Sequence, residues 1–142
     1  MVGSLHDLLA DRELDSVQPD VTVRLACHTL DARDVGAVVV LADTALVGIL
    51  SERDVIRKCV CGGRATDETL VAEIMTPNPV VIDINCSITK ALDTMRAGGF
   101  RHLPVMRGTA VVGLLSMRDI PTQNRLMLER YQQYTSRAGV PS

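Results

Sequence analysis

The hydrophobic and polar positions of this chain predict the same order of helices and strands twice. In the first half, apolar residues at helical spacing alternate with short β-rich runs. The predicted elements are a helix over 5–10, an extended segment over 16–18, a helix over 21–33, strands over 37–41 and 45–50, and a helix over 51–60. The run from Ala37 to Leu41 is continuously apolar, which is typical of a strand buried on both faces. The two strands are expected to pair as a hairpin.

The second half repeats this order. Its predicted elements are a helix over 70–75, an extended segment over 80–82, a helix over 87–97, strands over 102–106 and 110–115, and a last helix from Pro121 to about residue 137. The last helix is longer than its counterpart in the first half, and its apolar residues lie on more than one side. We therefore expect it, with Tyr131 and Tyr134, to pack on a second subunit or a partner.

An internal repeat at an offset of 65 positions relates the two halves. Residues 44–54 match residues 109–119 without a gap, and eight of the eleven positions are identical. A half of about 60 residues alone would bury only a marginal core. The sequence therefore predicts an α/β (α+β) fold in which two β-α-β-β-α repeats pack sheet to sheet with pseudo-twofold symmetry. We divide the chain into a first repeat over 1–62, a linker over 63–69, a second repeat over 70–123, and a C-terminal helix and tail over 124–142.

Composition narrows the function classes. The net charge is −2, which gives no reason to expect nucleic-acid binding. The longest apolar run, from Ala37 to Ala42, is too short to span a bilayer, and the first residues lack the pattern of a signal peptide. We expect no membrane partner and a cytoplasmic location.

Three polar residues recur in register after the second strand of each hairpin. They are Ser51, Arg53 and Asp54 in the first repeat and Ser116, Arg118 and Asp119 in the second. One interpretation is a capping box, in which the serine and the acid close the first turn of a helix. The other is ribose-phosphate recognition, with the aspartate on the ribose hydroxyls and the serine and arginine on phosphate at a helix start. A cap requires neither the arginine nor the glycines Gly48 and Gly113, but spacing alone leaves both interpretations open.

The strings that carry these residues resemble the CBS domain. The matching segments are residues 36–40 with 46–54, residues 101–105 with 111–119, and Glu-Ile-Met-Thr-Pro at 73–77. The whole chain resembles a tandem CBS pair, also called a Bateman module, of the stand-alone kind. This resemblance implies two clefts between the repeats that bind an adenosine nucleotide such as AMP, ADP, ATP or NAD(H), or S-adenosylmethionine. It also implies a homodimer that regulates a partner protein, here unknown, as an energy or redox sensor.

The resemblance also assigns candidate binding residues. Asp54 and Asp119 would hold the riboses, and the neighbouring serines and arginines would hold phosphate. Adenine would lie near Val17, Val35, Gly36 and Ala37 in one cleft, and near Val81 and Phe100 in the other. Arg101 and His102 stand where the first repeat has Gly36 and Ala37, so the cleft that they face should be the more basic and prefer the more phosphorylated ligand.

The sequence contains no recognisable catalytic set, and we expect no enzymatic activity and no bound metal. Two alternatives to a nucleotide sensor remain. The first is an interaction module that binds no ligand, in which the repeated polar residues only cap helices. The second is a thiol or metal switch through Cys59 and Cys61, although one Cys-x-Cys pair supplies half of the ligands of a usual zinc site.

Overall fold

The computed structural model describes residues 3–127 and residue 130. Its elements are α1 (Leu5–Leu9), β1 (Ser16–Val17), α2 (Val23–Arg33), β2 (Ala37–Ala42), β3 (Ala45–Ser51), α3 (Glu52–Asp54), the π-helix η1 (Val55–Val60), α4 (Val71–Ile74), β4 (Thr76–Pro77), β5 (Ile82–Asp83), α5 (Ile88–Gly98), β6 (His102–Arg107), β7 (Ala110–Ser116) and the 3-10 helix η2 (Met117–Asp119). They form two sheets, of order β1-β2-β3-β4 and β5-β6-β7. The predicted α/β fold of two sheet-forming repeats is confirmed.

The two hairpins repeat each other down to their irregularities. In the first, Ala37 pairs with Ser51, and in the second His102 pairs with Ser116, so the registers are offset by the 65 positions of the sequence repeat. The ladder shifts after Val40 in one hairpin and after Val105 in the other, which are again equivalent positions. The sequence repeat therefore fixes the strand register as well as the strand order.

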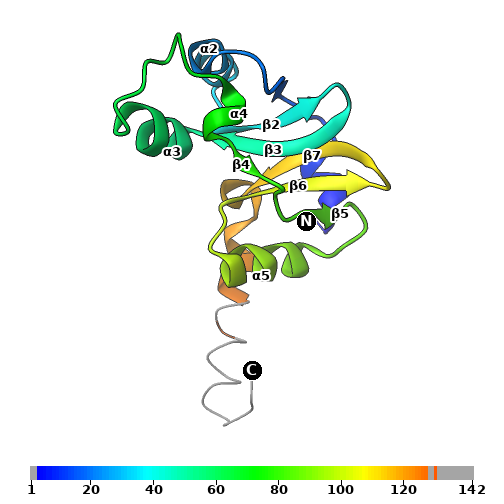
Figure 1. Cartoon of the computed structure of the whole chain (residues 1–142). Helices are drawn as coiled ribbons and strands as arrows, with labels where there is room; N and C mark the ends of the chain where they lie inside the picture. The colour runs from blue at the N-terminus through cyan, green and yellow to red at the C-terminus, as the bar shows by residue number, and fades with distance from the viewer. Residues whose placement is uncertain (1–2, 128–129, 131–142) are drawn as a thin grey trace.

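The sheets lie against each other in the middle of the molecule, and the helices cover their outer faces (Figure 1). In β2, Val38 and Val40 belong to the cluster under α2, whereas Val39 between them is fully buried outside that cluster. Because successive side chains of a strand point to opposite faces, Val39 faces the second sheet. This explains the continuous apolar run of β2, which is buried on both faces.

Two helices pack across the repeats in a way that the sequence did not predict. α1 begins the first repeat, but Leu5 and Leu9 belong to the core of the second sheet. α4 begins the second repeat, but Val71 and Ile74 belong to the core of the first. The strand β4 follows α4 and pairs with β3 of the first sheet. The domain boundaries drawn above remain a prediction, and the two hydrophobic cores do not follow them.

The helix starts are fixed by side-chain caps. Thr22 accepts a hydrogen bond from the Leu25 backbone N–H and caps α2, two residues after the predicted start of that element. Ser87 caps α5 in the same way, and Gly99 ends it in a left-handed conformation, as its sequence predicts.

After Pro121 the chain is helical over residues 122–127, which confirms the predicted start of the last helix. The remainder of that prediction, including Tyr131 and Tyr134, lies outside the described residues. Within the described part, no helix is both long and apolar enough to cross a bilayer.

Candidate functional site

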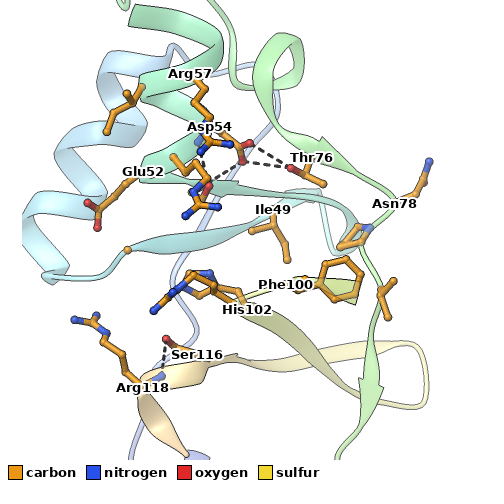
Figure 2. A pocket seen from close by; sticks show the side chains of 18 residues that line it. Ile49, Glu52, Asp54, Arg57, Thr76, Asn78, Phe100, His102, Ser116 and Arg118 are labelled. Carbon is orange, nitrogen blue, oxygen red and sulfur yellow. Dashed lines mark hydrogen bonds between the residues drawn. The ribbon is translucent and has the colours of Figure 1, made fainter. Parts of the chain in front are cut away.

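Two pockets lie at the ends of the two hairpins, and each contains one of the repeated aspartates. The Asp54 pocket has a volume of about 760 Å³, and the Asp119 pocket about 550 Å³. Both are lined by residues of both repeats, and they share Gly36, His102, Ser116 and Arg118. Figure 2 shows Asp54 and Glu52 of the first repeat facing the same space as Phe100 and Arg118 of the second.

Most of the candidate binding residues line these pockets. The Asp54 pocket contains Ser51, Arg53, Asp54, Phe100, Arg101 and His102. The Asp119 pocket contains Val35, Gly36, Ala37, Ser116, Arg118 and Asp119. Each aspartate thus lies with candidate residues from the other repeat.

Two candidates lie elsewhere. Val17 belongs to the core cluster of the first sheet and lines neither pocket. Val81 is exposed and also lines neither, and its neighbour Val80 takes the place beside Phe100 in the Asp54 pocket. The extended segment before β5 is too short to show a hydrophobic periodicity. The sequence therefore could not indicate which of the two valines lines the pocket.

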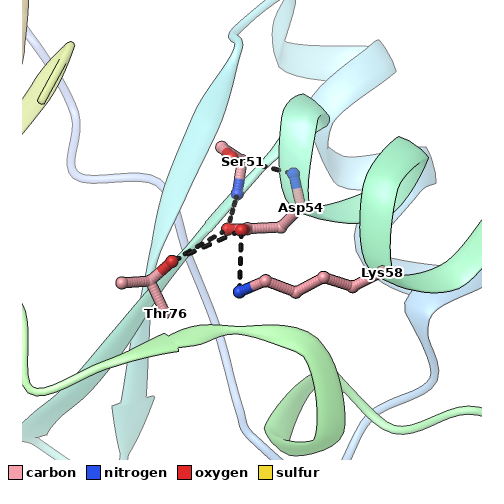
Figure 3. Close-up of polar contacts among 4 residues, drawn as sticks. All are labelled: Ser51, Asp54, Lys58 and Thr76. Carbon is pink, nitrogen blue, oxygen red and sulfur yellow. Dashed lines mark hydrogen bonds and ion pairs between the residues drawn. The ribbon is translucent and has the colours of Figure 1, made fainter. Parts of the chain in front are cut away.

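Asp54 is a nearly buried carboxylate with a defined set of partners (Figure 3). Its Oδ2 accepts the Ser51 backbone N–H at 3.1 Å, and its own N–H donates to Ser51 Oγ at 3.1 Å. These two bonds form the predicted capping box. The Thr76 hydroxyl donates to both carboxylate oxygens at 3.3 and 3.4 Å, and Lys58 Nζ lies 3.1 Å from Oδ1. The cap therefore uses Oδ2, whereas Oδ1 contacts the side chains of Thr76 and Lys58.

Asp119 is held differently. Its Oδ2 accepts the Ser116 backbone N–H at 2.7 Å in a capping box, and Ser116 Oγ also accepts from the Arg118 N–H at 3.3 Å. Oδ1 forms an ion pair with Arg12 of the segment after α1. The turn is a short 3-10 helix because Pro121 forces the preceding Ile120 into an extended conformation, and the helix cannot continue as it does after Asp54.

The repeated glycines allow close packing at equivalent places beside the two pockets. A Cβ on Gly48 would lie 2.9 Å from the carbonyl oxygen of Thr76, and one on Gly113 would lie 2.9 Å from Leu9 Cδ1. The first close approach seats β4 against β3 and brings Thr76 to Asp54. The second seats α1 against β7. The sequence did not predict Thr76 or Arg12 as neighbours of the two aspartates. The available signal was the pair of glycines, because a glycine indicates a position where another segment can pack closely against the strand.

His102 lies between the two pockets. Burial, and then the positive charge of Arg101, lower the pKa of His102, with a smaller contribution of the same sign from Arg118 and an opposing one from Asp119. The imidazole is therefore neutral at pH 7, and a bound anion nearby would raise its pKa.

This shift makes the stability of the protein depend on pH. In the unfolded chain His102 gains its proton near its ordinary pKa of about 6.5, whereas the folded protein keeps it neutral to lower pH. The free energy of unfolding is expected to decrease as the pH falls from about 7 toward 5, and less steeply in His102→Gln. Urea titrations at several pH values measure this, with the exposed His28→Gln as the matched control. Parallel curves for wild type and His102→Gln would contradict the assignment.

The cysteines do not form a common site among the described residues. Cys59 is fully buried in the first core, where its thiol donates to the carbonyl oxygen of Arg64 at 3.4 Å, whereas Cys61 is exposed. Burial raises the pKa of the neighbouring Cys27 thiol, and Cys59 adds to this shift, so that thiol is less reactive. No group of three or more potential metal ligands occurs within the described part of the chain. The two cysteines of the Cys-x-Cys pair therefore lie in different surroundings, one in the core and one at the surface.

The chain belongs to the CBS domain family, whose family model matches residues 4–60 and 71–120. It is 32% identical over 124 residues to the mitochondrial CBS domain-containing protein CBSX3 of Arabidopsis thaliana, and the match covers 81% of this chain and 60% of CBSX3. It is 35% identical to CBSCBSPB3 of the same plant over 72% of this chain and 18% of that protein. The chain thus spans only part of the length of these curated relatives.

Solved structures agree with this assignment. A CBS domain-containing protein of Agrobacterium tumefaciens superposes with a TM-score of 0.78 at 36% identity, covering 88% of this chain and 95% of that one. A CBS domain protein of Pyrobaculum aerophilum, solved in complex with AMP, superposes with a TM-score of 0.79 at 26% identity, covering 89% and 98%. The fold is therefore that of a CBS pair.

Proposed function

We propose that this CBS pair binds adenosine nucleotides in the Asp54 and Asp119 pockets and regulates a partner protein in response. The observation that carries the proposal is the pair of equivalent pockets, each with a carboxylate, a serine and arginines at the end of a hairpin. The AMP complex of the Pyrobaculum aerophilum protein supports the ligand class. The residues bind and do no chemistry, and the protein acts in the cytoplasm by a shift between conformations.

The contacts of Asp54 suit a ribose. The two hydrogen bonds from Thr76 are long, at 3.3 and 3.4 Å, and a ribose hydroxyl can replace one hydroxyl donor with another at little cost. Phe100 and Val80 offer an apolar contact for the adenine ring, and arginines of the same pocket offer charge for phosphate. The base, the phosphate and the charge-assisted bonds between the ribose and the carboxylate then all contribute to the binding free energy, and the carboxylate also fixes the orientation of the sugar.

Thermal unfolding with AMP, ADP, ATP, NADH and S-adenosylmethionine tests the proposal. A ligand at a hundredfold excess over its Kd is expected to stabilise the wild type by about 2.7 kcal/mol. Asp54→Asn keeps an oxygen for the Ser51 cap but loses the charge-assisted bonds to the ribose, so binding in that pocket should weaken about tenfold to a hundredfold. The exposed Asp93→Asn on α5 is the matched control and should respond like wild type.

The result that would contradict the proposal is the absence of stabilisation by every nucleotide in protein free of carried-over ligand. In that case the interaction module that binds no ligand becomes the better account. Turnover of a bound nucleotide would contradict the non-catalytic part.

We also propose that two chains associate as a homodimer. Large apolar side chains remain exposed on α2 and η1, the helices over the first sheet: Leu25 at 53%, Ile56 at 55% and Val60 at 60%. Burial of these side chains against a second copy would stabilise the pair. Sedimentation equilibrium measures the mass, and a monomer at micromolar concentration would contradict this proposal.

A further inference from the structure

The two pockets differ in the sign of their charge. In the Asp54 pocket, four guanidinium groups (Arg53, Arg57, Arg101, Arg118) face two carboxylates (Glu52, Asp54), which gives a formal charge of +2. The Asp119 pocket contains five carboxylates (Asp11, Glu13, Asp15, Asp34, Asp119) and three guanidinium groups (Arg12, Arg33, Arg118), which gives −2. Since Arg118 lines both, the difference comes from residues that belong to one pocket alone.

Two of the three arginines of the Asp119 pocket, Arg12 and Arg33, are already neutralised, and the third, Arg118, is shared with the Asp54 pocket. Arg33 donates to Asp15 at 2.7 Å and to Glu13 at 2.8 Å, and these two carboxylates raise the pKa of Arg33. Arg12 forms its ion pair with Asp119 itself. A phosphate entering this pocket would compete with carboxylates for Arg12 and Arg33 and would meet Asp11 and Asp34 without compensation.

The arginines of the Asp54 pocket are not neutralised in this way. Among residues 3–127, no ion pair joins Arg53, Arg57 or Arg101 to a carboxylate, and the cation on Asp54 is Lys58. These guanidinium groups are therefore available to oxygens of a phosphate chain, for which arginine has the matching geometry. The neutral His102 beside Arg101 can gain a proton when that chain is bound.

We propose that the Asp54 pocket is the site for adenosine ligands with a chain of two or more phosphates, and that the Asp119 pocket excludes them and takes an adenosine ligand with at most one phosphate. This inference rests on the proposed nucleotide binding and specifies which ligand each pocket takes. The protein then binds two adenosine species at the same time, because a highly charged ligand and a weakly charged one occupy different pockets.

Calorimetric titrations with ATP and with adenosine test the inference on wild type, Arg101→Ala and Arg24→Ala. ATP is expected to occupy one site per chain, and its affinity should fall about tenfold in Arg101→Ala and steeply with added salt. Adenosine should bind wild type and Arg101→Ala within twofold, and change little with salt. Arg24→Ala is the matched control, because Arg24 is an exposed arginine on α2 outside both pockets, and it should leave both ligands unchanged.

Three results would overturn the inference. ATP could fill two equal sites per chain, Arg101→Ala could weaken adenosine as much as ATP, or the affinity for ATP could be independent of salt. Each of these leaves nucleotide binding itself intact. If neither ATP nor adenosine binds at all, the proposed function fails, and this outcome is distinct from the other three.

Discussion

Replacement of Leu5 by alanine is expected to lower the free energy of unfolding by about 2–5 kcal/mol. Leu5 is fully buried, and it packs in the core of the second sheet together with residues such as Leu92 and Leu103. Truncation removes apolar contacts and leaves a cavity in this cluster.

Urea unfolding of Leu5→Ala and Val81→Ala measures this. Val81 is exposed and belongs to neither hydrophobic core, so its truncation should change the stability by no more than about 0.5 kcal/mol. Similar small losses of stability for both variants would show that α1 does not complete the second core. They would contradict the packing of α1 against the sheet of the other repeat.

Gly48→Ala is expected to destabilise the protein by about 1–3 kcal/mol and to weaken ligand binding in the Asp54 pocket. The new Cβ would lie 2.6 Å from Met75 Sδ and 2.9 Å from the carbonyl oxygen of Thr76. The sulfur can move, but the carbonyl belongs to β4, which pairs with β3 at this point. Relief of the contact therefore displaces β4, and with it the Thr76 hydroxyl beside Asp54.

The equivalent substitution in the second repeat, Gly113→Ala, is the comparison. Its new Cβ meets Leu9 Cδ1 at 2.9 Å, which is the end of a side chain that can rotate, so the loss should be smaller. Thermal unfolding with and without AMP separates the loss of stability from the loss of binding. An equal or smaller loss in Gly48→Ala would show that β4 is not held against β3 at this position.

Local features of the fold were predictable from the sequence because they depend on residues close together in the chain. The two hairpins, the caps at Ser51 and Ser87 and the left-handed end at Gly99 follow from strand patterns and cap chemistry. The predicted start of α2 at residue 21 was two residues early. Asp20, just before that position, and Thr22 are both residue types that cap helices, and only the structure shows that Thr22 is the one that does so.

Long-range features were not predictable. The apolar faces of α1 and α4 suit either sheet, so no local pattern shows that each helix covers the sheet of the other repeat. The same limitation affected the candidate site. Arg12 reaches Asp119 only because α1 crosses over, and Val17 was assigned to a pocket although it faces the first core. The repeated glycines were taken as support for a binding site, and their role is to admit these crossing segments.

Backbone amide chemical shifts, measured with and without saturating AMP, test the central claim most directly. The account predicts that the shifted amides cluster at the pocket walls, at residues 51–54, 76, 78, 80 and 100–102 for one pocket or 34–37 and 116–119 for the other. Amides on the outer faces of α2 and α5 should stay unchanged. An unchanged spectrum, or shifts confined to those outer faces, would contradict the assignment of these pockets to nucleotides.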